Sequence, residues 1–276
     1  LKDADIIVLT RERTHITRSL IEKLPRLKFI AQTGRVGTHI DVQACTERGI
    51  AVSEGVGSPI APAELTWALT MAAMRRLPQY ISNLKHGVWQ QAGLKAGSMP
   101  PNFGLGMVLS GKTLGIWGYG KVGQLVAGYG RAFGMEVLVW GSEASRQQAQ
   151  ADGFSVALDQ QDLFIRSDVV SLHLRLSDTT RGIVTAGDLA CMKPTALLVN
   201  TSRSELIEPD ALVGALNRGR PGMAAVDVLE TEPVLQGHAL LRLENCICTP
   251  HIGYVEQDSY ERYFGVAFDN VINFIK

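Results

Sequence analysis

A glycine-rich turn between a predicted strand and a predicted helix restricts the fold of this chain more than any other segment. Gly118-Tyr119-Gly120-Lys121-Val122-Gly123 follows the apolar run TLGIW (113–117) and leads into the helical stretch KVGQLVAGYGRAF. In a G-x-G-x-x-G turn the first glycine permits the tight bend, the second lets backbone approach a pyrophosphate, and the third allows close helix packing. The pattern alone is weak in a chain with 28 glycines, but its place between a strand and a helix predicts a dinucleotide site. The candidate cofactor-binding residues are Gly118, Gly120, Lys121, Val122 and Gly123.

Short apolar runs alternate with amphipathic segments through most of the chain, which is the pattern of βα units in a parallel sheet. In the main domain we expect strands at 113–117, 136–140, 168–174, 196–200, 223–228 and 246–249. A smaller α/β unit precedes them, with strands expected in IIVLT, LKFIAQT and GIAV. The sequence therefore predicts an α/β protein with a doubly wound parallel Rossmann-type sheet and a second, smaller flavodoxin-like domain.

A segment rich in glycine, proline and methionine (97–111) is typical of a hinge between these regions. A long amphipathic stretch (62–87) precedes it. A closing helix is expected over 255–276, where it would pack back on the first unit. We therefore predict a substrate domain of residues 1–97 plus 254–276 and a dinucleotide-binding domain of residues 98–253.

Composition favours a globular protein without a polyanionic partner. The chain carries 27 basic and 27 acidic side chains, so neither nucleic acid nor an anionic membrane is an expected partner. No apolar run approaches the ~18 residues of a membrane span, and the opening LKDAD lacks a secretory pattern. The four cysteines favour a reduced chain, although Cys246 and Cys248 also fit a metal site weakly. We expect a cytoplasmic protein without a bound metal.

The end of the second strand of the dinucleotide unit leaves the choice of cofactor open. An acidic residue usually binds the adenosine ribose there, but VLVWGSEASR places Gly141 at that position. Arg146 with Ser142 and Ser145 could hold a 2'-phosphate, whereas Glu143 could bind the ribose diol from a shifted position. Because no basic residue directly follows the strand, we expect NAD and keep NADP as the alternative.

Polar side chains follow three successive strands of the predicted sheet. Arg203 comes after ALLVN, Glu232 after MAAVDV, and His251 after CICT. Because ligands of an open parallel sheet bind beyond the carboxyl ends of its strands, these side chains are expected to share one rim, with Asp227 facing the same crevice. Taken singly, each residue has an ordinary structural explanation: Arg203 as a helix cap, Glu232 as a solvated loop residue and His251 as a loop histidine. A chance occurrence of all three after successive strands is much less expected.

These residue types suit hydride transfer between a nicotinamide and a carbonyl group. The carbonyl oxygen needs a proton donor, and histidine titrates nearest to neutral pH. A neighbouring carboxylate such as Glu232 would hold the ring of His251 and favour its protonated form. An arginine fork such as Arg203 would grip a 2-keto acid and polarise its carbonyl. Arg203, Glu232 and His251 are therefore the catalytic candidates.

The whole combination resembles the D-isomer-specific 2-hydroxyacid dehydrogenases, the family that includes phosphoglycerate dehydrogenase and glyoxylate/hydroxypyruvate reductase. GYGKVG, SDVVSLHL, MKPTALLVNTSR, GMAAVDVLETEP and NCICTPHIG fall in the family's order. The resemblance implies an NAD(P)-dependent oxidoreductase acting on the CH–OH group of a small D-2-hydroxy acid, such as phosphoglycerate, or on glyoxylate or hydroxypyruvate in reverse. It also implies that Arg203 binds substrate, that Glu232 supports the acid/base His251, and that Asp227 holds the carboxamide side of the nicotinamide. Thr201, Ser202 and Gly253 would line the cofactor.

In the small domain, TGRVGTHID resembles the family's substrate loop, whose backbone N–H groups at Val36 and Gly37 would take the substrate carboxylate. Arg13 is similar to an arginine near the substrate pocket of some members, or it is an exposed basic residue. His173 is similar to a common histidine at a strand end, and we expect it to be structural. Family members are usually dimers built around the helix expected near 62–86. That segment suits a homodimer or the core, and we expect the homodimer.

Three features depart from the family pattern. Its first βαβ stretch, about fifty residues, is missing before LKDAD, so we expect a truncated or incompletely represented chain with an unpaired sheet edge. The substrate loop is a residue short between Gly37 and Ile40, and the ribose acid is absent.

A nucleotide-sensing corepressor or scaffold is the alternative function, because such proteins keep the same three polar residues. Phosphite oxidation is a further alternative.

Overall fold

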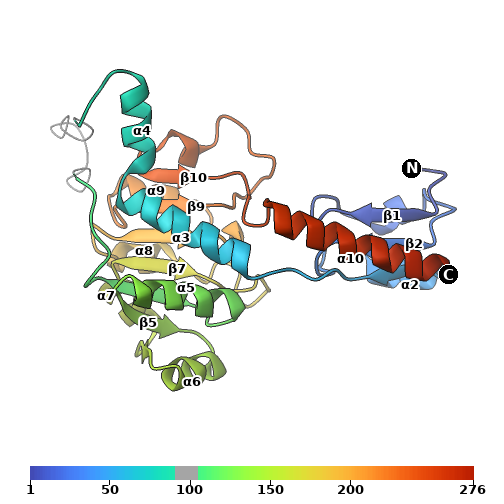
Figure 1. The fold of residues 1–276 in the computed structure, drawn as a ribbon, viewed down its shortest axis with the longest axis horizontal. Coiled ribbons are helices and arrows are strands. Elements are labelled where there is room, and N and C mark those ends of the chain that lie inside the picture. The colour runs from blue at the N-terminus through green and yellow to red at the C-terminus, as the bar shows by residue number, and fades with distance from the viewer. Residues whose placement is uncertain (91–104) are drawn as a thin grey trace. The chain divides into compact units, whose positions relative to one another are not determined.

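The computed structural model describes residues 1–90 and 105–276, which form two compact units (Figure 1). The small unit comprises Leu1–Ser58 and Tyr254–Lys276, and the large unit comprises Pro59–Gly253. The division falls after residue 58, whereas the sequence placed it after residue 97. The reason is that helix α3 (Ile60–Met74) buries Leu69 and Met74 in the core of the large unit. The predicted hinge falls largely on residues 91–104, outside the described residues.

Seven parallel strands build the sheet of the large unit, in the order β10-β9-β8-β7-β4-β5-β6. The strands are β4 (Thr113–Trp117), β5 (Glu136–Trp140), β6 (Ser155–Val156), β7 (Val169–Leu172), β8 (Leu197–Asn200), β9 (Met223–Val226) and β10 (Cys246–Cys248). The chain starts in the middle at β4 and is wound outward in both directions, so the predicted doubly wound sheet is confirmed. The glycine-rich turn leaves the sheet at the carboxyl end of β4, where the strand order reverses.

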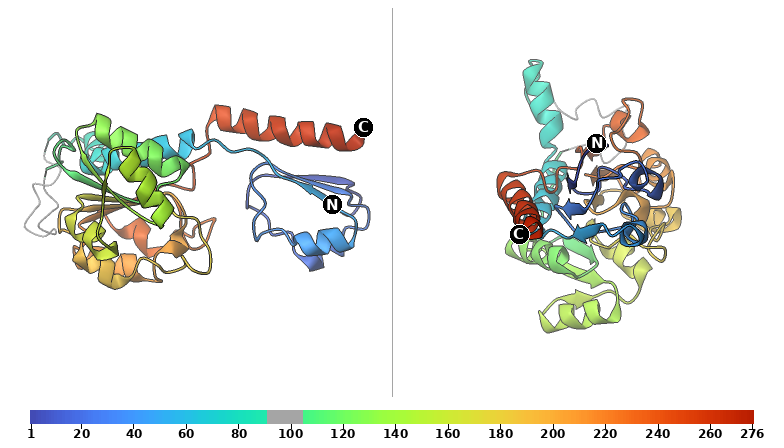
Figure 2. Two further views of the ribbon diagram at one scale, coloured as in Figure 1. Left: turned by 90° about the horizontal axis from the view of Figure 1, so that it is seen from below. Right: turned by 90° about the vertical axis from the view of Figure 1, so that its right-hand side faces the viewer.

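Helices cover both faces of this sheet (Figure 2). Leu197 and Val199 of β8 pack on the side of α3 and α5, whereas Leu198 packs on the side of α8 and α9. Because alternate residues of a strand point to opposite faces, a strand buried on both sides becomes a continuous apolar run. The remaining helices are α5 (Lys121–Ala132), α6 (Glu143–Ala151), α7 (Gln160–Arg166), α8 (Ala186–Cys191) and α9 (Ala211–Asn217), with short 3-10 turns η2 (Ser204–Leu206) and η3 (Ala239–Arg242).

The predicted long helix near 62–86 is two helices, α3 and α4 (Leu77–Lys85). Arg76 takes a left-handed backbone, with φ of 53°, and separates them. Pro78 explains the break, because a proline is tolerated in the first turn of a helix but not in its interior. The apolar face expected for a partner is divided accordingly: α3 is packed into the core, and α4 is exposed.

The small unit has three parallel strands, β1 (Ile6–Leu9), β2 (Phe29–Gln32) and β3 (Ala51–Ser53), in that order. Phe29 and Ala31 of β2 pack against the closing helix α10 (Gln257–Ile275), as predicted, while Ile30 packs on the other face. That face carries α1 (Arg18–Ile21) and α2 (Val42–Glu47). Within the described residues β1 pairs only with β2.

None of the helices in the described part of the chain is long and apolar enough to cross a bilayer. Residues 1–90 and 105–276 hold no cluster of three or more His, Cys, Asp or Glu side chains placed to bind a metal ion. Cys246 and Cys248 lie on one face of β10 with sulfur atoms 3.7 Å apart, and both pack against the core.

Candidate active site

Glu232 and His251 meet at the carboxyl ends of β9 and β10. Glu232 Oε2 lies 2.6 Å from His251 Nδ1, and Glu232 Oε1 accepts from the backbone N–H of Leu229 at 3.1 Å. Because an ionised carboxylate only accepts, Nδ1 of the imidazole carries the hydrogen and Nε2 points away from the pair. The imidazole is 30% exposed and the carboxylate side chain 39%. The contact therefore fixes the orientation of the imidazole, and its role as a proton donor stays a prediction.

The loop of residues 249–253 holds His251 in a left-handed backbone conformation, with φ of 53°. This region is unfavourable for residues other than glycine, so surrounding contacts must maintain it. The side chain of Asp227 supplies them. Its Oδ1 accepts from the Thr249 hydroxyl at 2.5 Å and from Ile252 N–H at 2.8 Å, and its Oδ2 accepts from Gly253 N–H at 2.8 Å. One buried carboxylate thus fixes the loop on both sides of the imidazole.

Burial raises the pKa of Asp227 above its usual value. The hydrogen bonds from Thr249, Ile252 and Gly253 and the charge of His251 act in the opposite direction, because they favour the ionised carboxylate. The sequence assigned Asp227 to the carboxamide side of a nicotinamide. The structure engages both of its oxygens with the histidine loop, and the contact to the cofactor stays a prediction.

Arg203 stands at the start of η2, just beyond β8 and on the same rim as the pair. The turn that presents it is fixed by Asn200, whose side chain is 1% exposed. Asn200 Nδ2 donates to the carbonyl of Arg203 at 2.8 Å, and Asn200 Oδ1 accepts from Ser202 N–H at 3.0 Å. The guanidinium donates from Nη1 to the carbonyl of Ser202 at 2.7 Å. Since β8, β9 and β10 are neighbours, the three predicted residues follow three adjacent strands.

In the glycine-rich turn, packing requires glycine at residues 118 and 123 but not at residue 120. A Cβ at Gly118, whose φ is 98°, would lie 2.6 Å from the carbonyl oxygen of His173, and a Cβ at Gly123 would lie 2.1 Å from that of Gly118. A Cβ at Gly120 would meet nothing within 4 Å. Gly120 also begins α5 without a side-chain cap, which leaves the N–H groups of Lys121 and Val122 open to a ligand. The space at Gly120 and this helix start fit a pyrophosphate.

The other predicted cofactor residues, Thr201, Ser202 and Gly253, also serve the protein's own packing. The Thr201 hydroxyl lies 2.7 Å from that of Thr66 on α3, and the Ser202 hydroxyl donates to the carbonyl of Leu172 at 2.7 Å. A Cβ at Gly253 would lie 3.2 Å from Asp227 Oδ2. Their contact with a cofactor stays a prediction.

At the end of β5, the guanidinium of Arg146 stacks on the ring of Trp140, 4.7 Å from its centroid. Ser142 caps α6 by accepting from Ser145 N–H. Gly141 has φ of 156° and connects the strand to this helix. The candidate phosphate-binding groups are thus engaged in local structure.

In the small unit, the predicted substrate loop follows β2. Val36 N–H donates to Glu54 Oε1 at 2.8 Å, and Gly37 is exposed. Arg13 Nε donates to the hydroxyl of Tyr254 at 3.1 Å. Neither of the two expectations for Arg13 is tested by this contact, but it ties the side chain to the start of the closing segment.

Sequence reasoning overlooked Arg11. Its backbone is left-handed, with φ of 54°, and its guanidinium lies 5.2 Å from the ring centroid of Tyr254 and 5.5 Å from that of Tyr263. Such stacking holds a cation in place over an aromatic face. The signal in the sequence was the pair Arg11 and Arg13 directly after a strand, which presents two cations from one turn.

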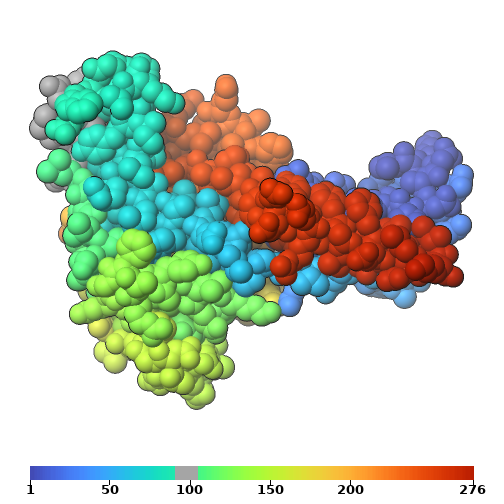
Figure 3. All heavy atoms as spheres, viewed as in Figure 1, coloured from blue at the N-terminus to red at the C-terminus, as the bar shows by residue number. Residues whose placement is uncertain are grey.

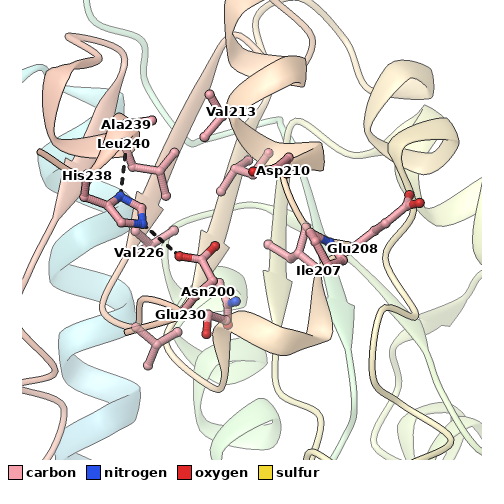
Figure 4. Close-up of a pocket in the computed structure, with 14 residues that line it drawn as sticks. Asn200, Ile207, Glu208, Asp210, Val213, Val226, Glu230, His238, Ala239 and Leu240 are labelled. Carbon is pink, nitrogen blue, oxygen red and sulfur yellow. Dashed lines mark hydrogen bonds and ion pairs between the residues drawn. The ribbon is translucent and has the colours of Figure 1, made fainter. Parts of the chain in front are cut away.

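A cavity of about 340 Å³ lies between the ends of β8 and β9, the start of α9, and η3 (Figure 4). A second histidine–carboxylate pair borders it. His238 Nε2 lies 2.8 Å from Glu230 Oε2, and His238 Nδ1 accepts from Leu240 N–H at 3.3 Å. Because Glu230 is two residues before Glu232, this pair anchors the segment that presents the catalytic candidate. Sequence analysis did not single it out.

The fold is that of a nicotinamide-dependent oxidoreductase, and the Glu232–His251 pair lies on the rim of its dinucleotide-binding sheet. The family model of the D-isomer specific 2-hydroxyacid dehydrogenase NAD binding domain matches residues 67–253. The chain is 39% identical to a D-3-phosphoglycerate dehydrogenase of Methanocaldococcus jannaschii over 92% of this chain and 46% of that protein. It is 36% identical to a glyoxylate reductase of Aeropyrum pernix over 92% of this chain and 75% of that protein.

A solved structure assigned as a D-3-phosphoglycerate dehydrogenase oxidoreductase from Ralstonia solanacearum is 66% identical. It has a TM-score of 0.96 over 99% of this chain and 81% of that chain. This chain spans about half the length of the Methanocaldococcus protein and most of the other two. It belongs to the D-isomer-specific 2-hydroxyacid dehydrogenase family. It is therefore an NAD-binding oxidoreductase that acts on CH–OH groups, as the sequence predicted.

Proposed function

We propose that this protein reduces a small 2-keto acid to the D-2-hydroxy acid and catalyses the reverse oxidation. The observation that carries the proposal is the 2.6 Å contact between Glu232 and His251, which orients the imidazole at the end of β10. A bound nicotinamide cofactor supplies or accepts the hydride. Such a reaction also requires one proton to reach the carbonyl oxygen, and His251 is the side chain placed to deliver it.

In the reduction, His251 Nε2 donates its proton to the carbonyl oxygen as negative charge develops there. Glu232 retains the hydrogen on Nδ1 and stabilises the ring in its charged form before the transfer. Arg203 orients the substrate and polarises the carbonyl. Asp227 maintains the loop of His251, because its hydrogen bonds fix residues 249, 252 and 253.

For the substrate, we propose a 2-keto acid whose carboxylate binds at Val36 and Gly37 and whose far end is anionic. Arg11 and Arg13 support the anionic end, since both lie on one turn and are held by tyrosine side chains. Two relatives indicate the range of substrates to test. One is named for a substrate with a phosphate group, phosphoglycerate, and the other for a substrate without one, glyoxylate.

A panel of 2-keto acids, each assayed with NADH and NADPH, tests the function. Oxidation of the reduced cofactor is expected with phosphohydroxypyruvate, hydroxypyruvate or glyoxylate. Tight cofactor binding without turnover of any acid in the panel would contradict the enzyme and favour a nucleotide-sensing scaffold. Faster turnover of glyoxylate than of phosphohydroxypyruvate would contradict the role proposed for the two arginines.

We propose NAD as the preferred cofactor. Arg146 is stacked on Trp140 and Ser142 caps α6, so the groups that could bind a 2'-phosphate already have partners. The same panel decides between the two cofactors through the ratio of kcat/KM values for NADH and NADPH.

We also propose a homodimer that forms through α4. Leu77, Ile81 and Leu84 follow the i, i+4, i+7 spacing of one helical face, and each is 45% to 58% exposed. In the space-filling view α4, in teal, stands at the surface of the large unit (Figure 3). We further propose a cytoplasmic location, which the sparse use of cysteine, four in 276 residues, supports.

A further inference from the structure

The backbone N–H group that the proposed function assigns to the substrate carboxylate already holds a carboxylate of the protein. Val36 N–H donates to Glu54 Oε1 over 2.8 Å. Glu54 directly follows β3 in the same unit, and it is exposed. A backbone N–H group binds a glutamate side chain and a ligand carboxylate through the same charge-assisted hydrogen bond. Glu54 and a substrate carboxylate therefore compete for one donor.

The fold fixes the backbone of Glu54 beside the loop from two directions. Gly55 N–H donates to the carbonyl of Gly34 at 2.8 Å, and Asn270 Nδ2 of α10 donates to the carbonyl of Glu54 at 3.3 Å. A Cβ at residue 55 would lie 2.1 Å from the carbonyl oxygen of Thr33, so only glycine permits this approach. The location of Glu54 is thus built into the chain, while its exposed side chain keeps the rotamer freedom to move aside.

The charge of Glu54 adds repulsion to this competition. Of the lysine, arginine and histidine side chains in residues 1–90 and 105–276, none forms an ion pair with the Glu54 carboxylate. With no ion pair to offset it, the negative charge of Glu54 repels a second carboxylate at the loop. A ligand must therefore both displace the hydrogen bond and approach a like charge.

We propose that Glu54 sets the affinity for substrate, because its carboxylate occupies Val36 N–H until a substrate carboxylate displaces it. The inference rests on the proposed function, because that function places the substrate carboxylate at this loop. Glu54 then weakens binding of every 2-keto acid by the same step and leaves the proton transfer from His251 unchanged. Its effect belongs in KM, with kcat unaffected.

The test compares Glu54→Gln and Glu54→Ala with the matched control Glu22→Gln, which removes an exposed charge from the end of α1. KM for hydroxypyruvate at saturating NADH is expected to fall about tenfold in Glu54→Ala and less in Glu54→Gln, the scale of one hydrogen bond to a charged group. The kcat of each variant should remain within about twofold of the wild type. Glu22→Gln should leave both constants unchanged.

Calorimetric titration of oxalate into the NADH-bound protein provides a readout that does not need turnover. Oxalate is an analogue of a 2-keto acid, with a second carboxylate in place of the keto carbonyl. Its Kd should fall in parallel with the KM of hydroxypyruvate. An unchanged or higher oxalate Kd in both Glu54 variants, with wild-type unfolding temperatures, would overturn the inference. If the wild type turns over no 2-keto acid, the proposed function fails, and the oxalate titration still decides whether Glu54 competes for Val36.

Discussion

Asp227 shows how one buried side chain can decide the geometry of another residue's chemistry. His251 occupies a left-handed backbone region, and Asp227 accepts hydrogen bonds from Thr249, Ile252 and Gly253 around it. An asparagine in its place keeps the size but offers only one acceptor oxygen and cannot serve all three donors. The position of the imidazole is therefore expected to loosen when the carboxylate is lost.

We predict that Asp227→Asn lowers kcat by roughly tenfold to a hundredfold. A catalytic group that is displaced by about 1 Å loses rate on this scale. The Kd of NADH should change little, because the change acts through the histidine loop. Asp178→Asn, at an exposed loop position, serves as the control. A raised NADH Kd with an unaffected kcat would instead support the contact to the nicotinamide that the sequence suggested.

His173 provides a pH-dependent contribution to stability. Burial lowers the pKa of His173 from 6.5 to about 4, and the ring bonds to the Ser171 hydroxyl at 2.9 Å. Between these two pH values the unfolded chain binds a proton that the folded chain does not, so acidification favours unfolding. The stabilisation is present above pH 6.5 and is lost as the pH falls toward 4.

We predict that the free energy of unfolding depends more steeply on pH in the wild type than in His173→Asn. Free energies of unfolding from urea titrations at pH 7 and pH 5 provide the measurement, since the difference between the two proteins should shrink on acidification. Equal losses of stability in both proteins would show that His173 is not held neutral in the folded state.

Among the structural elements, the turn after β4 contains two glycines that packing requires and a third, Gly120, that packing does not require. A methyl group at residue 123 would clash with the carbonyl of Gly118, whereas one at residue 120 would point into open space. We predict that Gly123→Ala destabilises the protein by about 1–3 kcal/mol. Gly120→Ala should keep the wild-type unfolding temperature but weaken NADH binding at least about tenfold, because its Cβ takes pyrophosphate space.

The measurement is thermal unfolding together with fluorescence titration of NADH for both variants. Gly123→Ala serves as the comparison for misfolding, since its binding defect should follow its loss of stability. Wild-type NADH affinity in Gly120→Ala would contradict the assignment of this turn to the pyrophosphate.

Elements with strong periodicity could be predicted from the sequence, and those that depend on remote contacts could not. The strands at 113–117 and 136–140 were predicted to the residue, because buried parallel strands are continuous apolar runs. The break between α3 and α4 was missed although Pro78 signals it. The two-residue strand β6 is too short to show a pattern.

The same distinction between local patterns and remote contacts holds for the candidate site. Arg203, Glu232 and His251 could be found because each follows a predicted strand, and parallel strands end on one rim. The bonds of Asp227 to residues 249–253, the stacking of Arg11, and the contact of Glu54 with Val36 join segments far apart in the chain. No local pattern announces such contacts, because they exist only once the sheet has formed.

For the whole molecule, the exposed apolar face of α4 predicts that the protein is a homodimer. We expect the wild type to elute as a dimer in size-exclusion chromatography with light scattering. The double change Ile81→Asp and Leu84→Asp should yield a monomer, because two buried charges at an apolar interface cannot be accommodated. Leu158→Asp, at a residue that is 84% exposed elsewhere on the large unit, should leave the dimer intact. A monomeric wild type would refute the proposed interface.

We propose above that His251, held by Glu232 and positioned by Asp227, transfers the proton in a hydride-transfer reaction. The most direct test of this proposal is kcat for His251→Asn with the best keto acid of the panel, alongside the Kd of NADH for the same variant. We expect kcat to fall by roughly two to four orders of magnitude, with the Kd of NADH unchanged. A kcat equal to that of the wild type would contradict it.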